Sequence, residues 1–194
     1  MSQQKTTSRQ IYDYALRLLE SEGPQAVTMR RVANEIGITP MAIYHHFASR
    51  EAMLSEIVDN EFEKLAGFFS RPRSHRSFEA KVVHMMDAYV DYALAHPRIF
   101  DYVFSHPRPG ARRYPADFRP RRSPTLNILA DELAALMKLK RLKREDVWEL
   151  AIELWAHTHG YLMLYRAGRF NLREAEFREL IHRSLRRLLY GLAR

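Results

Sequence analysis

Two short helices joined by a tight turn are encoded in residues 28–50, TMRRVANEIGITPMAIYHHFASR, and this segment constrains the fold more than any other part of the chain. Thr28 is a good N-cap, because its hydroxyl can accept a hydrogen bond from the free backbone N–H groups of the first helical turn. Gly37 ends this helix, since glycine takes the left-handed conformation of a C-terminal cap without steric cost. Thr39 followed by Pro40 is an N-cap with proline at the first helical position, so a second helix begins at once.

The second helix is expected to run from Pro40 to about Phe47, with Ile43 and Phe47 one turn apart on its inner face. Five side chains are left nearer the outside: Met41, Ala42, Tyr44, His45 and His46. Two helices joined by so short a turn form a helix-turn-helix, in which the second helix is the one that enters the major groove of DNA.

The rest of the chain shows the helical period with almost no strand signal, which predicts an all-α fold of about nine helices. One helix is expected to follow an N-cap at Ser49, and the next to end at His96-Pro97, with a basic break at residues 71–76 between them. Pro97 then opens a short helix through Phe104. The clearest apolar stripes are Ile11, Ala15, Leu18 and Leu19; Leu54, Ile57, Val58, Phe62 and Leu65; Phe78, Val82, Met86, Tyr89 and Ala93; and Leu126, Leu129, Leu133 and Leu136.

Two further helices are expected near the end of the chain, over about residues 145–168 and from residue 171 onward. Asn171 with Glu174 three residues later resembles a capping box. The helix over residues 145–168 is apolar on two sides, and one monomer seldom has partners for both. We therefore expect a homodimer in which these two helices meet their copies in a four-helix bundle. The two stripes are Val147, Leu150, Ala151 and Leu154, and Trp148, Ile152, Trp155 and Leu162.

Residues 106–124, HPRPGARRYPADFRPRRSP, interrupt the helical pattern with five prolines and six arginines. This composition resists regular structure and indicates a mobile loop. We interpret it as a solvated connector in preference to a second nucleic-acid contact, although repeated arginines can also bind phosphates.

Composition limits the possible partners. Of the 194 residues 46% are hydrophobic and 28% charged, which is typical of a globular protein, and the formal net charge of +8 favours a polyanionic partner. The chain has no cysteine, so disulfides and thiolate metal sites are excluded. The first ten residues lack the apolar core of a signal peptide, and no apolar run approaches a membrane span, so we expect a cytoplasmic protein with no membrane partner.

The segment from Ile11, with IYDYALRLLESEGPQAVTMRRVANEIG followed by ITPMAIYHHFASREAML, resembles the DNA-binding domain of the tetracycline-repressor (TetR) family of bacterial transcription regulators. The resemblance implies a DNA-binding domain over residues 1–50 and an effector-binding and dimerisation domain over residues 51–194. It also implies that the start of the second helix of the motif meets base edges, and that nearby polar side chains contact phosphates. The base-facing positions are Thr39, Pro40, Met41 and Ala42, and the phosphate-facing positions are Thr28, Arg30, Tyr44, His46 and Arg50.

The base-facing surface is unusually apolar, because it has no Arg, Asn or Gln for bidentate pairing with guanine or adenine. Direct readout is therefore expected to rely on methyl contacts with thymine, on the Thr39 hydroxyl and on His45, with a larger share for DNA shape. Taken singly, Tyr44 is also typical of a half-buried core residue, and Arg30 of a solvated helix face. Taken together, the residues favour double-stranded DNA.

The sequence LWAHTHG, residues 154–160, resembles a Trp-His-Gly signature in the C-terminal domain of one branch of the same family. Simple core packing explains Trp155 and His159 equally well, and we favour it. The functional alternative is a pocket for a small, partly apolar effector. Its expected lining is Met86, Tyr89, Phe100, Val103, Trp155 and His159.

Two other functions remain as alternatives. An enzyme or metal protein is disfavoured, because the nine histidines include no His-Glu-x-x-His set, and adjacent His45 and His46 point about 100° apart on a helix. We expect neither a cofactor nor a bound metal. A basic architectural protein without an effector would bind any duplex with similar affinity. The favoured mechanism is a dimeric repressor on an inverted-repeat operator, released when an effector repositions the helix that follows Ser49.

Overall fold

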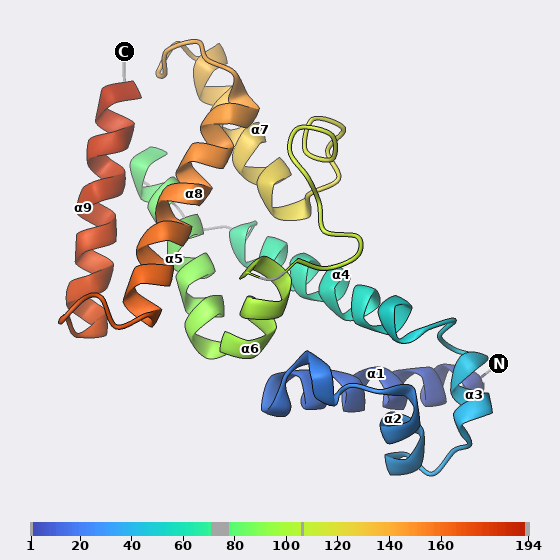
Figure 1. The fold of residues 1–194 in the computed structure, drawn as a ribbon. Coiled ribbons are helices and arrows are strands. Elements are labelled where there is room, and N and C mark those ends of the chain that lie inside the picture. Colours follow the sequence, from blue (N-terminus) through green and yellow to red (C-terminus); the bar gives the residue numbers. More distant parts are fainter. Residues whose placement is uncertain (1, 71–77, 106, 193–194) are drawn as a thin grey trace. The chain divides into compact units, whose positions relative to one another are not determined.

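The computed structural model describes residues 2–70, 78–105 and 107–192, which divide into two compact units (Figure 1). Unit 1 contains residues up to Phe62 together with residues 92–111, and unit 2 contains residues 63–91 and 112–194. The basic break expected at residues 71–76 lies outside the described residues. The domain boundary expected after Arg50 remains a prediction.

The described residues form nine α-helices and no strand, as the all-α expectation required. No helix among them is long and apolar enough to cross a membrane. The helices are α1 (Ser2–Glu22), α2 (Met29–Glu35), α3 (Pro40–Tyr44), α4 (Arg50–Phe69), α5 (Phe78–Ala95), α6 (Pro97–Phe100), α7 (Pro124–Lys138), α8 (Val147–Arg166) and α9 (Glu174–Leu192), with a 3-10 turn at Pro24–Ala26 and a π-helix at Asp101–Ser105 after α6.

The core of unit 1 is built from the predicted stripes. All four stripe residues of α1 are at most 4% exposed, and Leu54, Ile57 and Val58 of α4 are at most 1% exposed. In the helix-turn-helix, Val32, Ile43 and Phe47 lie against this core. Each side chain removes apolar surface from water, which stabilises the small domain by roughly 25 cal/mol for each Å² buried.

α2 ends where the sequence predicts. The backbone N–H of Ile38 donates to the carbonyl of Ala33 over 3.0 Å, and the N–H of Gly37 donates to the carbonyl of Asn34 over 3.3 Å. This pair of hydrogen bonds is a Schellman motif, which requires a left-handed residue. Gly37 supplies it with φ of 73°. The chain therefore turns sharply and leaves α3 at an angle to α2.

The helix α6 lies against the end of α1 within unit 1. Arg98 donates to the backbone carbonyls of Glu20 and Ser21, the last turn of α1. The imidazole Nδ1 of His96 lies 2.6 Å from the carboxylate of Glu20. A positive side chain at a helix C-terminus satisfies carbonyls that have no partner within the helix. The short helix opened by Pro97 thus has a defined structural role.

Unit 2 is formed by α7, α8 and α9, with the last part of α4 and the first part of α5 (Figure 1). The α7 stripe is buried, as are Leu150, Ala151 and Leu154 of α8. α8 and α9 are joined by stacked rings, with the centroids of Tyr165 and Phe177 4.0 Å apart. Both helices therefore bury part of their apolar stripes inside one chain, whereas Ile152 and Trp155 of α8 are only half-buried.

Two predicted helix ends were wrong. α3 ends at Tyr44 and not near Phe47, because His46 and Phe47 both donate to the carbonyl of Ile43 in a closing turn that buries Phe47. α9 begins at Glu174 and not after Asn171. The carboxylate of Glu176 accepts a hydrogen bond from the backbone N–H of Arg173 over 2.8 Å. This is one of the two hydrogen bonds of a capping box, and it lies two residues later than expected.

The proline-rich and arginine-rich segment has no regular structure over its described residues 107–122, as expected, but its residues 112–122 belong to unit 2 and are held there by ion pairs. Arg119 binds Asp146, the N-cap of α8, over 2.7 Å, and Arg121 binds Asp131 of α7 over 2.7 Å. Phe118, which directly precedes Arg119, is 7% exposed. The segment is a connector that is attached to two helices at defined points.

Candidate nucleic-acid interface

The first turn of α3 is held by its own capping residues. The hydroxyl of Thr39 accepts a hydrogen bond from the backbone N–H of Ala42 over 3.1 Å, and Pro40 follows as the first helical residue. Thr28 caps α2 in the same way by accepting from the N–H of Arg31 over 3.2 Å. Both predicted caps are confirmed. They fix the positions at which the outer side chains of the motif leave the backbone.

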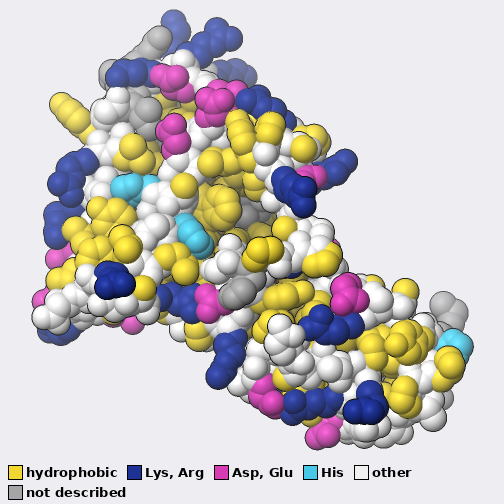
Figure 2. All heavy atoms as spheres, viewed as in Figure 1, with side chains coloured by type: hydrophobic (Ala, Val, Ile, Leu, Met, Phe, Trp, Pro, Cys, Tyr) yellow, Lys and Arg dark blue, Asp and Glu magenta, His cyan; other side chains and the backbone are white. Residues whose placement is uncertain are grey.

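The outer side chains of α3 are exposed as a helix-turn-helix requires. Met41 is 71% exposed and Tyr44 51% exposed, and His45 is also exposed. Ala42 and His46 are partly covered. Figure 2 shows hydrophobic and basic side chains mixed on the visible face of unit 1. This surface can meet a groove floor with apolar atoms and a phosphate backbone with polar ones.

Arg30 and Arg31 differ although they are neighbours on α2. Arg30 is exposed, whereas the guanidinium of Arg31 makes two hydrogen bonds to the carboxylate of Glu22 at the end of α1. This pairing lowers the pKa of Glu22 and raises that of Arg31. Arg31 therefore joins α2 to α1, whereas the contact of Arg30 with a phosphate remains a prediction.

Arg50 has contacts that sequence reasoning did not anticipate. Its Nε donates to the carbonyl of Val27 over 2.6 Å, and another of its nitrogens donates to the carbonyl of Pro24. A third lies 3.4 Å from Glu51. The guanidinium thus connects the start of α4 to the 3-10 turn before α2. Two residues more than twenty positions away supply these acceptors, and no local spacing in the sequence signals such contacts.

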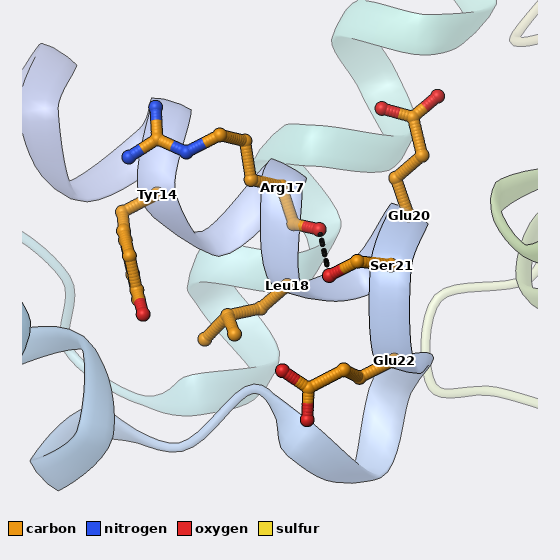
Figure 3. A pocket seen from close by; sticks show the side chains of 6 residues that line it. All are labelled: Tyr14, Arg17, Leu18, Glu20, Ser21 and Glu22. Atoms are coloured by element: carbon orange, nitrogen blue, oxygen red, sulfur yellow. Dashed lines mark hydrogen bonds between the residues drawn. The ribbon is translucent and has the colours of Figure 1, made fainter.

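An open depression lies on the surface of α1 and is lined by Tyr14, Arg17, Leu18, Glu20, Ser21 and Glu22 (Figure 3). The hydroxyl of Ser21 donates to the carbonyl of Arg17 over 2.7 Å, so this polar group is satisfied within the helix. The lining mixes one guanidinium with two carboxylates. This depression differs from the predicted effector pocket, and its mixed charge selects no ligand class.

Four of the six predicted pocket residues belong to unit 2, and Phe100 and Val103 belong to unit 1. Within unit 2, the hydroxyl of Tyr89 lies 2.8 Å from Nδ1 of His159, and Trp155 also makes a hydrogen bond with Tyr89. Burial raises the pKa of Tyr89, which is 2% exposed, and lowers the pKa of His159, with a smaller contribution from Arg166. Tyr89 therefore stays protonated, and its hydroxyl shares a hydrogen bond with the imidazole of His159, with a direction set by the imidazole tautomer.

A buried carboxylate in unit 1 was also missed from the sequence. Glu61 is 4% exposed and accepts a hydrogen bond from the hydroxyl of Tyr92 over 3.1 Å. Burial and the nearby carboxylate raise the pKa of Tyr92, and they raise the pKa of Tyr12 to about 12. Since three helices contribute these side chains, only the folded chain brings them together.

Among the residues that the structure describes, no group of three or more His, Cys, Asp or Glu side chains could hold a metal ion.

Comparisons with known proteins agree with this architecture. An uncharacterized HTH-type transcriptional regulator of Mycobacterium tuberculosis is 24% identical over 165 residues, which cover 84% of this chain and 72% of that protein. A protein of unknown function from Rhodococcus sp. RHA1 has a similar fold, with a TM-score of 0.77 and 22% identity over 96% of this chain and 95% of that one. A TetR-family transcriptional regulator from Pectobacterium atrosepticum has a TM-score of 0.68 and 15% identity over 100% of this chain and 97% of that one.

Two family models match the sequence itself. Residues 11–57 match the bacterial regulatory proteins of the tetR family, and residues 82–188 match the tetracyclin repressor-like C-terminal domain. The first match contains α2, α3 and both of their caps, and the second covers more than half of the chain. The capped helix-turn-helix, the all-α fold and these matches show that the chain belongs to the tetracycline-repressor family of bacterial transcription regulators.

Proposed function

We propose that the protein is a homodimeric repressor that binds an inverted-repeat DNA operator and leaves it when a small, partly apolar molecule binds. The observation that carries the DNA-binding part is the exposure of Met41, Tyr44 and His45, on and directly after a helix whose start is fixed by the Thr39 cap. Such a helix can enter a major groove without rearrangement. The protein would act in the cytoplasm, where a bacterial chromosome lies.

The contacts divide into two kinds under this proposal. Thr39, Pro40, Met41, Ala42 and His45 face base edges, and Thr28, Arg30, Tyr44 and His46 face phosphates. Phosphate contacts set affinity and register, whereas base contacts set the preferred sequence. Arg50 enters this scheme differently. Its guanidinium already donates hydrogen bonds to two backbone carbonyls, so its role under this proposal is to support the motif.

The dimer part is supported by the outer surface of α8. Ala156, Gly160 and Leu164 follow one another at helical spacing and are all exposed. Nothing lies within 4 Å of the position that a Cβ on Gly160 would take, so another helix can approach there. In a two-fold dimer through α8 and α9, the two α3 helices would meet successive turns of one groove, roughly 34 Å apart.

The effector part is supported by the hydrogen-bonded Tyr89 and His159 in unit 2, where Tyr89 is buried beside Trp155. A ligand with one polar group and an apolar body fits such surroundings. To release DNA, it must bind the DNA-incompetent shape more tightly than the other. No catalytic step is part of the proposal.

Selection of bound fragments from a random duplex pool tests the DNA-binding part, with the mass of the complex measured in parallel. We expect an inverted-repeat consensus occupied by two chains. Equal retention of all duplexes would favour a basic architectural protein and would contradict the proposal. Small-molecule libraries screened against the selected duplex then test release, with the duplex-free protein as the reference for ligand affinity.

A further inference from the structure

The exposed apolar side chains of unit 1 are concentrated on one helix. Among the described residues of this unit, the large hydrophobic side chains that are exposed are Met41 and Tyr44, and both belong to α3. Single exposed apolar residues are ordinary on protein surfaces. Two of them on a five-residue helix that also carries the base-facing positions are a specific feature of this chain.

The polar atoms in the first turn of α3 are largely committed. The Thr39 oxygen already accepts from the N–H of Ala42, so its hydroxyl hydrogen is the one side-chain donor left in this turn, and Pro40 has no N–H. Beyond Thr39, the side chains of this turn are a pyrrolidine ring, a thioether and a methyl group. A guanine, adenine or cytosine edge facing Met41 would therefore lose water from its donors or acceptors and gain no partner in return.

Thymine differs from the other bases in this respect. Its 5-methyl group is the apolar feature of the major-groove floor, and a flexible thioether side chain adapts well to it. We propose that Met41 is the specificity-determining residue of each half-site and that it reads the 5-methyl group of thymine. This inference rests on the proposed function, because it assumes that α3 lies in the groove.

The size of the effect follows from the methyl group alone. Burying one such group changes affinity by about fourfold, so that two half-sites of a symmetric operator give about fifteenfold together. The polar neighbours on the exposed face, Tyr44 and His45, can contact phosphates or other bases and leave this effect unchanged.

Deoxyuridine substitution isolates the methyl group, because uracil pairs as thymine does and lacks only that group. Each thymine of the selected duplex is replaced in turn and the affinity is measured. We expect one symmetry-related pair of positions at which the loss is about fourfold per half-site. Placing 5-methylcytosine at this position should recover part of the affinity relative to cytosine.

Met41→Ala provides the second arm, and Leu139→Ala is its matched control. Leu139 is also an exposed apolar residue, at 65%, but belongs to unit 2. Met41→Ala should abolish the difference between thymine and uracil at the sensitive pair, while Leu139→Ala should preserve it. Circular dichroism checks that both variants keep the wild-type melting curve, as expected for exposed side chains.

The possible results separate the two proposals. A two-fold consensus with no uracil-sensitive position, or with a sensitivity that persists in Met41→Ala, overturns the inference and leaves the proposed function standing. Absence of any sequence-dependent binding overturns the proposed function and the inference with it.

Discussion

The Nε atom of Arg50 donates a 2.6 Å hydrogen bond to the backbone carbonyl of Val27, twenty-three residues earlier in the chain. The bond joins the first turn of α4 to the extended backbone just before α2. A charged donor facing a partly buried carbonyl contributes more than a surface contact does. Arg50 therefore stabilises the frame from which α2 and α3 project.

Replacing Arg50 by alanine should lower the free energy of unfolding by about 2 kcal/mol, since two carbonyl acceptors lose a charged donor. Urea denaturation measures this change. Arg50→Lys should be intermediate, because one ammonium group cannot reach both carbonyls with the same geometry. Unchanged stability together with a large loss of DNA affinity would return Arg50 to the phosphate-contacting role expected from the sequence.

Tyr44→Phe removes one hydroxyl from the exposed face of α3. We expect a uniform loss of affinity for all duplexes of about 1 kcal/mol with an unchanged salt dependence, because a neutral donor releases no counterion. Arg30→Gln should instead reduce the slope of affinity against salt by about one. Tyr190→Phe is the control, since Tyr190 is 84% exposed on α9. A change of base preference in Tyr44→Phe would contradict this division of roles.

Glu61 and Tyr92 form a buried pair whose hydroxyl-to-carboxylate distance is 3.1 Å. Tyr92→Phe should cost about 2 kcal/mol, because the buried carboxylate loses a donor. Combining it with Glu61→Gln should cost less than the sum of the two single changes, and a double-mutant cycle in urea gives the difference. Strict additivity of the two changes would show that the pair is not coupled.

Acid should destabilise unit 2 through His159. Burial lowers its pKa below the ordinary value of 6.5 in the folded chain. The unfolded chain therefore binds the proton first, and stability that is complete above about pH 6.5 is lost as pH falls toward the folded-state pKa. The unfolding midpoint followed between neutral pH and pH 5 tests this. His159→Gln should flatten the profile, although it lowers stability at neutral pH, and an unaltered profile would exclude His159 as the cause.

Leu164→Glu should separate the proposed dimer, because Leu164 is 49% exposed on the outer face of α8. Light scattering should then report the mass of one chain, 22.9 kDa, where the wild type gives twice that value. Leu139→Glu introduces the same charge at a more exposed position and should leave the dimer intact. A dimer that survives Leu164→Glu would place the interface elsewhere.

Features set by neighbouring residues could be predicted from the sequence. The caps at Thr28, Thr39 and Ser49 all accept the hydrogen bonds expected of them, and Gly37 has the expected left-handed conformation. The residues in each of these contacts lie within one or two helical turns of each other, so a short stretch of sequence is enough to predict the contact. The buried stripes follow for the same reason.

Features that depend on distant residues could not be predicted. The chain has two acidic residues near the start of α9, and which one completes the cap is decided by where the preceding turn places the backbone. The sequence identifies Arg50 only as a basic residue at the start of a helix. Folding brings the carbonyl of Val27 within hydrogen-bond distance of its guanidinium. Contacts between the outer face of α3 and DNA remain predictions for the same reason, since the groove itself is needed to test them.

The arginines between α6 and α7 have a practical consequence. Because Arg119 and Arg121 bind acidic side chains of α8 and α7, these two positive charges are neutralised within the chain and contribute little to attraction of a polyanion. Shortening this irregular stretch, a common step when a protein is trimmed for crystallisation, would leave the amino terminus of α8 without Arg119 and would remove the buried ring of Phe118 from unit 2. Trimming there should reduce solubility and yield instead of improving them.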